Sequence, residues 1–128
     1  MSYLFQDTAR AARRLQLLAD VFAPASRAFL QDSVSRVPQL AVDLGSGPGY
    51  TTRLLLDTTQ CERAIGLDTS EPFLTLARRN ATERLSFVRH DVTQVPFPIE
   101  QSDLISCRFL LIWLSIEASC ESPLLLER

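Results

Sequence analysis

An aspartate followed by three alternate glycines is the part of this sequence whose residue types point most directly to chemistry. Residues 40–50 read Leu-Ala-Val-Asp-Leu-Gly-Ser-Gly-Pro-Gly-Tyr, so Asp43 closes an apolar run, and glycines follow at positions 45, 47 and 49. Glycine has no Cβ, so it adopts a positive φ easily and lets the backbone come close to a bound molecule. The pattern predicts a buried strand that ends in a ligand-binding turn.

The spacing of the glycines separates this turn from two related phosphate-binding turns. A dinucleotide-binding turn needs a third glycine at the position where this sequence has Tyr50. A P-loop ends in Gly-Lys-Ser or Gly-Lys-Thr, and the sequence contains no lysine. The remaining pattern, Asp-x-Gly-x-Gly-x-Gly, resembles the first motif of the class I S-adenosylmethionine-dependent methyltransferases.

Two further acids stand at the ends of segments with strand character. Asp68 closes the apolar run 64–68, and Asp91 follows the run 85–90. The resemblance implies that Asp68 accepts hydrogen bonds from both ribose hydroxyls of the cofactor. It also implies that Asp91 and the backbone of Val92 bind the adenine. The alternatives are that Asp68 caps the helix that follows it and that Asp91 caps a turn.

The resemblance implies S-adenosyl-L-methionine as the cofactor and a set of residues around it. In that set, Asp43 organises the glycine turn and helps to hold the amino end of the methionine portion. The implied cofactor-binding residues are Asp43, Gly45, Ser46, Gly47, Gly49, Asp68, Thr69, Phe73, Asp91, Val92 and Arg108. We expect no catalytic base and no metal ligands, because the sulfonium methyl group already carries the driving force and the protein need only align an acceptor.

Three side chains keep alternative interpretations. Phe73 lies near the adenine or the sugar, or it is a core residue. Arg108 binds an anionic substrate through two parallel hydrogen bonds, or it forms a surface ion pair with Asp103. His90, the only histidine, is expected at the rim of the crevice without a chemical role.

The sequence after the fourth predicted strand bears on the methyl acceptor. Residues 106–109 read Ser-Cys-Arg-Phe, so the Asn/Asp-Pro-Pro-Tyr/Phe motif of methyltransferases that act on amino groups of nucleic acids and glutamine is absent. That favours a small-molecule acceptor, with an oxygen or a carboxylate as the methylated group.

The composition is that of an ordinary globular protein. A charged fraction of 22% and a net charge of -2 give no electrostatic support for a nucleic-acid or membrane partner. The three cysteines, at positions 61, 107 and 120, form no Cys-x-x-Cys pair, which indicates reduced thiols in a cytoplasmic protein. No segment has the pattern of a signal peptide or the length of a membrane span.

The elements that must position these residues alternate between helix and strand. Two helices are expected before the glycine turn, one over residues 7–22 and a second that starts at Pro24 and stops before Pro38. The later expected elements are a helix over 50–56, a strand over 64–68, a helix capped by Thr69 or Ser70 and ending before Asn80, a strand over 85–90, a loop over 95–99, a strand over 103–107 and a helix from 109 to 114.

This order predicts an α/β fold of the Rossmann-like, doubly wound type, with a mostly parallel sheet and helices on both faces. Ligands in such sheets bind beyond the carboxyl ends of the strands, so one crevice can collect the predicted site residues. We divide the chain into an N-terminal helical cap (1–37), a partial S-adenosylmethionine-binding domain (38–114) and an atypical tail (115–128). About four of the family's usual seven strands are expected, as in a C-terminally truncated chain.

Three functional hypotheses follow. The first is a small-molecule methyltransferase whose truncated form binds the cofactor without full activity. The second is a non-catalytic module that binds the cofactor or a partner, for example by self-association through the open edge of its sheet. The third is an NAD(P)-type oxidoreductase, which the missing glycine at position 50 disfavours.

Overall fold

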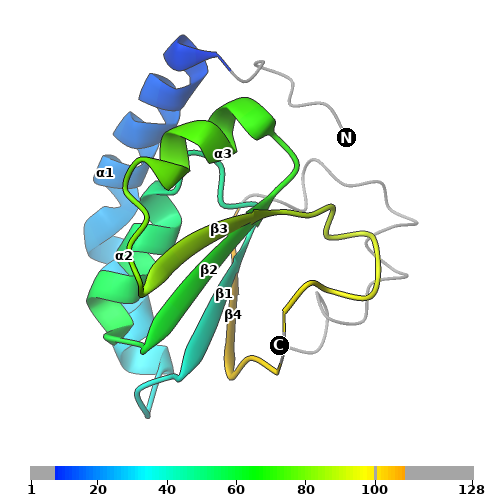
Figure 1. The fold of residues 1–128 in the computed structure, drawn as a ribbon. Helices are drawn as coiled ribbons and strands as arrows, with labels where there is room; N and C mark the ends of the chain where they lie inside the picture. Colours follow the sequence, from blue (N-terminus) through cyan, green and yellow to red (C-terminus); the bar gives the residue numbers. More distant parts are fainter. Residues whose placement is uncertain (1–7, 100, 109–128) are drawn as a thin grey trace.

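The described part of the chain forms a four-stranded parallel sheet with three helices beside it (Figure 1). The computed structural model describes residues 8–99 and 101–108. The strands are β1 (Leu40–Leu44), β2 (Arg63–Asp68), β3 (Leu85–Arg89) and β4 (Leu104–Cys107), and the helices are α1 (Ala9–Ser33), α2 (Tyr50–Thr59) and α3 (Glu71–Arg78). The sheet order is β3-β2-β1-β4. The predicted α/β class, the parallel sheet and the four strands are confirmed.

Strand β1 lies inside the sheet, with β2 on one side and β4 on the other. All five of its residues are buried, because a parallel strand between two neighbours is covered on both faces. Its carboxyl end carries Asp43, whose register partners are Gly66 in β2 and Ser106 in β4. The acid that precedes the glycine turn is therefore fixed within the sheet.

The three helices lie together on one side of the sheet (Figure 1). The core on that side consists of Ala41, Leu55, Leu56, Cys61, Ala64, Leu74, Ala77, Leu85 and Phe87. On the other side, Val42, Leu44 and Leu67 pack against Val92, Phe97 and Ile99 of the segment after β3. Helices on both faces were expected. The described helices cover one face, the segment after β3 covers the other, and the helix predicted from 109 to 114 lies outside the described residues.

The prediction of two N-terminal helices is wrong, because α1 continues through Pro24 as one helix of 25 residues. Proline in a helix removes a backbone hydrogen bond and usually costs about 3 kcal/mol. Pro24 is exposed, whereas Ala19 on one side of it is buried and Leu30 on the other packs against the core. Packing on both sides of the proline keeps the helix continuous.

Helix α3 begins as its sequence predicts. The Ser70 hydroxyl accepts a hydrogen bond from the backbone N–H of Phe73 at 3.2 Å, and Pro72 lies in the first turn. Helix α2 follows the glycine turn directly, with Gly49 in a left-handed conformation at its N-cap. Both helices therefore start at the carboxyl end of the preceding strand.

No helix in the described part of the chain is long and apolar enough to cross a membrane. Residues 8–99 and 101–108 also contain no group of three or more His, Cys, Asp or Glu side chains placed to hold a metal ion.

Candidate functional site

The glycine turn connects β1 to α2 and is tied to the end of strand β2. The φ angles of Gly45, Gly47 and Gly49 are 73°, 54° and 94°, so all three adopt the left-handed conformations that favour glycine. The backbone N–H groups of Gly45 and Ser46 both donate to the carbonyl of Leu67, at 2.8 and 3.0 Å. The turn is thus held against the neighbouring strand by hydrogen bonds from its first residues.

Packing imposes a different constraint on each glycine of the turn. A Cβ added to Gly49 would lie 2.8 Å from the Phe87 ring and 3.1 Å from the Ala77 Cβ. A Cβ added to Gly47 would meet nothing closer than the Leu15 side chain, at 3.9 Å. Gly49 is therefore required by the contact of the turn with β3 and α3, whereas Gly47 is required only by its backbone conformation.

Ser46 and Gly66 form a close contact that the sequence analysis missed. A Cβ on Gly66 would lie 2.6 Å from the Ser46 Cβ, so the serine occupies the space over the glycine in β2. The signal in the sequence is the glycine inside a strand, which often marks a close approach of another segment. The Ser46 hydroxyl is buried, with no hydrogen-bond partner among the described residues. Such an atom is one that a bound ligand or an ordered water commonly satisfies.

Asp43 is a buried carboxylate at the base of the turn, with 2% of its surface exposed. Its Oδ2 accepts hydrogen bonds from the hydroxyls of Thr51 and Thr52, both at 2.7 Å, in the first turn of α2. Burial raises the pKa of Asp43 to about 6, against the lowering effects of the two hydroxyls and of the Arg108 charge. Buried carboxyls with raised pKa values at strand ends are candidates for functional residues.

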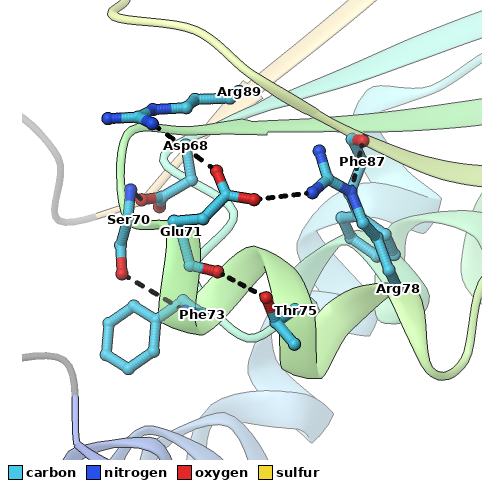
Figure 2. Close-up of polar contacts among 8 residues, drawn as sticks. All are labelled: Asp68, Ser70, Glu71, Phe73, Thr75, Arg78, Phe87 and Arg89. Carbon is cyan, nitrogen blue, oxygen red and sulfur yellow. Dashed lines mark hydrogen bonds and ion pairs between the residues drawn. The ribbon is translucent and has the colours of Figure 1, made fainter.

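Asp68 connects the glycine turn with the start of α3. One carboxylate oxygen accepts from the Gly47 N–H at 2.7 Å. The other accepts from the Ser70 N–H at 2.8 Å (Figure 2). Thr69 lies half-buried at this junction. The helix-start interaction predicted as the alternative is therefore present. It leaves a lone pair on each oxygen, so the ribose-binding role remains open to Asp68 as a prediction.

Asp91 forms its hydrogen bonds within its own turn. Its Oδ1 accepts from the backbone N–H of Thr93 at 2.9 Å and from the Thr93 hydroxyl at 2.7 Å. These bonds lower the pKa of Asp91. The side chain of Val92 is buried in the core on the face away from the helices. His90 lies beside them, with Nε2 2.9 Å from the Gln94 carbonyl oxygen.

Phe73 is placed as its core interpretation describes. The ring is 3% exposed and packs with Ala11 and Ala12 of α1. The structure thus brings together Asp43, the glycine turn and Asp68, and places Asp91 at the end of the adjacent strand. Phe73 lies under α1.

Arg108 follows β4 and interacts with α1. Its Nη1 donates to the Ser26 hydroxyl at 3.0 Å, and its guanidinium lies 5.9 Å from the centroid of the Phe22 ring. The alternative of an ion pair with Asp103 is wrong. The Asp103 carboxylate accepts from the N–H groups of Gln39 and Leu40, both at 2.9 Å, before β4 begins, so the two charges lie at opposite ends of the strand.

Comparison with known proteins gives the family. Residues 41–121, more than half of the chain, match the model of a family described as a methyltransferase domain. The chain belongs to the methyltransferase-domain family. This match favours the hypothesis of a methyltransferase over that of an NAD(P)-type oxidoreductase.

The individual relatives of this methyltransferase domain agree with the family match. A trans-aconitate 2-methyltransferase of Methylobacterium radiotolerans is 39% identical over 82 residues, covering 64% of the chain and 31% of the relative. A malonyl-[acyl-carrier protein] O-methyltransferase of Neorickettsia risticii is 34% identical, covering 62% of the chain and 31% of the relative. The methyltransferase domain thus spans about a third of the length of these relatives.

A solved structure supports the fold and the cofactor. An S-adenosylmethionine-dependent methyltransferase from Mesorhizobium loti superimposes with a TM-score of 0.62 at 27% identity. The alignment covers 77% of this methyltransferase domain and 45% of the solved chain. The prediction of S-adenosyl-L-methionine as the cofactor of the family is confirmed.

Proposed function

We propose that this chain supplies the cofactor-binding part of an S-adenosylmethionine-dependent methyltransferase that acts on a small molecule. The observation that carries the proposal is the hydrogen bond of 2.7 Å between the Gly47 N–H and Asp68. It joins the glycine turn to the acid at the end of the next strand, where ligands of open parallel sheets bind. The buried, unpartnered Ser46 hydroxyl beside the turn fits a bound ligand as well.

Each part of the cofactor has a residue of matching chemistry. Asp68 would accept a hydrogen bond from each of the two ribose hydroxyls. Each hydrogen bond to this charged group would contribute roughly 1.5–3 kcal/mol to binding. Asp91 and the Val92 backbone would bind the adenine. Asp43 would organise the glycine turn and so help to hold the amino end of the methionine portion. The bound cofactor supplies an activated methyl group. The protein aligns the acceptor and excludes water, which requires no base from this chain.

A carboxylate-bearing acceptor is the substrate class that we propose. The names of the relatives include trans-aconitate and malonyl-[acyl-carrier protein], both of which carry carboxylates. Arg108 lies at the carboxyl end of β4, where its charge acts on Asp43. A guanidinium there matches a carboxylate geometrically and electrostatically.

A second candidate is a binding module without turnover. The observation that favours it is the position of β4, which has one neighbouring strand, β1, within the described residues. An edge strand of this kind is a template for pairing with a second copy. Methyl transfer by the 128-residue chain to any carboxylic acid acceptor would rule out this candidate.

Calorimetry with S-adenosylhomocysteine tests the proposed function. Asp68→Asn should weaken binding at least about tenfold, because hydrogen bonds to a neutral amide replace those to a carboxylate. Asp57→Asn is the matched control, since Asp57 is an exposed acid on α2 whose partner is Arg53. No binding by the unmodified chain, or equal binding by the Asp68 variant, would contradict the proposal.

A further inference from the structure

The first turn of α3 carries a glutamate that lies between two arginines (Figure 2). One oxygen of Glu71 is 3.0 Å from Nη1 of Arg78, and the other is 3.7 Å from Nη1 of Arg89. The three side chains are 42–67% exposed, and ion pairs between exposed groups add little to folding stability. Their position next to Asp68 suggests a different role.

Arg89 is the register partner of Asp68 in the adjacent strand. Register partners in neighbouring strands place their side chains on the same face of the sheet, so the two opposite charges are neighbours that attract each other. The Asp68 carboxylate nevertheless accepts hydrogen bonds from the backbone, and the Arg89 guanidinium pairs with Glu71 (Figure 2). Arg89 is thus the register partner of one carboxylate and the ion-pair partner of another.

Glu71 is itself held in place from the other side. Arg78 donates from Nε to the Phe87 carbonyl at 3.3 Å and from Nη1 to Glu71. Arg78 thus bridges β3 and the start of α3 and fixes the glutamate where it reaches Arg89. The Arg78–Glu71–Arg89 group therefore connects β3 with the start of α3, next to the Asp68 carboxylate at the end of β2.

We propose that Glu71 is a positioning residue that keeps Arg89 away from Asp68. The Asp68 carboxylate then remains bonded to the Gly47 and Ser70 N–H groups and available to the ribose hydroxyls. The ribose part of this inference rests on the proposed function, whereas the Gly47 part does not. Without the charge of Glu71, Arg89 turns to Asp68 and draws its carboxylate away from the turn.

A double-mutant cycle with S-adenosylhomocysteine tests the ribose part. At about 50 mM salt, Glu71→Gln should weaken binding about fivefold, and at about 0.5 M salt the loss should shrink because exposed charges are screened. Arg89→Gln in the Glu71→Gln background should restore the affinity to within about twofold of Arg89→Gln alone. Glu83→Gln, the same charge change on an exposed residue before β3, should leave binding unchanged.

Amide hydrogen exchange tests the positioning without a ligand. The Gly47 N–H should exchange several-fold faster in Glu71→Gln than in the unmodified chain, and Arg89→Gln should reverse the increase. An unchanged Gly47 exchange rate in Glu71→Gln would overturn the inference. So would a loss of affinity for S-adenosylhomocysteine that persists when Arg89 is also replaced. If the unmodified chain binds no S-adenosylhomocysteine, the proposed function fails and the exchange experiment still decides the role of Glu71.

Discussion

The turn after β1 and the turn after β3 both carry an aspartate at the end of a strand, but the two acids are held differently. Asp43 bonds to Thr51 and Thr52 in the next helix, and its turn is tied to Asp68, 21 residues from Gly47. Among the described residues, the Asp91 carboxylate accepts its hydrogen bonds locally, from Thr93. The first acid is fixed by the tertiary fold, and the second by its own turn.

The two aspartates thus illustrate two ways in which a protein can hold a binding side chain in position. A group that several elements hold has its geometry set before a ligand arrives, which reduces the ordering cost of binding. A group in a local turn needs little from the rest of the fold and is easily replaced without harm to it. We therefore expect substitutions around the first turn to affect both stability and binding, and substitutions at Asp91 to affect binding more than stability.

The largest expected effect is on stability, from Gly49→Ala. Its Cβ would overlap the Phe87 ring at 2.8 Å, and its φ of 94° disfavours any side chain. Overpacking and the left-handed conformation together should cost about 3–5 kcal/mol. Gly47→Ala, the matched control, has room for its Cβ and should cost only about 1–2 kcal/mol. Urea denaturation of the two variants gives both values, and equal losses would contradict the packing role of Gly49.

Asp43→Asn should separate stability from binding. The folded-state pKa of about 6 lies above the ordinary aspartate pKa of 3.8, so the native chain binds the proton more tightly than the unfolded chain. The contribution of Asp43 to stability therefore falls as pH rises through this window, by roughly 2 kcal/mol between pH 4 and pH 7.

The measurement is the difference in unfolding free energy between the unmodified chain and Asp43→Asn across that pH range. The asparagine variant should gain in relative stability toward pH 7, because its amide oxygen still accepts from the threonine hydroxyls and carries no charge. Its affinity for S-adenosylhomocysteine should fall about tenfold or more. A variant that is less stable at pH 7 than at pH 4, relative to the unmodified chain, would refute the assigned pKa shift.

Asp91→Asn should have the smallest effect on the fold. The lowered pKa means that Asp91 contributes stability above its unfolded pKa, and that this contribution is lost as pH falls below about 3.8. At pH 7 the substitution should cost less than about 1 kcal/mol. It should nevertheless weaken S-adenosylhomocysteine binding about three- to tenfold, through the lost charge at the adenine amine.

S-inosylhomocysteine, an analogue of S-adenosylhomocysteine, is the discriminating control for Asp91. It replaces the adenine amine with a carbonyl, which an asparagine N–H can bond and a carboxylate cannot. The asparagine variant should therefore prefer this analogue relative to the unmodified chain. The same preference in both proteins would mean that Asp91 does not contact the base.

The sequence was informative where the deciding signal is local. The strand of Asp43 was visible because a strand buried on both faces is a continuous apolar run, and the Ser70 cap was visible because its partner is three residues away. The Ser46–Gly66 contact and the hydrogen bond from Gly47 to Asp68 join residues about 20 positions apart, so they depend on strand order.

The wrong predictions differ in their causes. Pro24 stays within α1 because packing on both sides outweighs its local preference. The pairing of Arg108 with Asp103 could have been excluded from the sequence, since the four residues of an intervening strand span about 13 Å. The position of Phe73 under α1 could not have been, because nothing in the sequence fixes where that helix lies.

The central claim is that S-adenosyl-L-methionine binds at the carboxyl ends of β1, β2 and β3. The most direct measurement is a titration of the isotopically labelled chain with S-adenosylhomocysteine, followed by backbone amide chemical shifts. We predict saturable shifts at Gly45, Gly47, Thr69 and Val92, and none at Glu83 near the opposite end of the sheet. Shifts confined to other surfaces, or no shifts at millimolar ligand, would contradict the account.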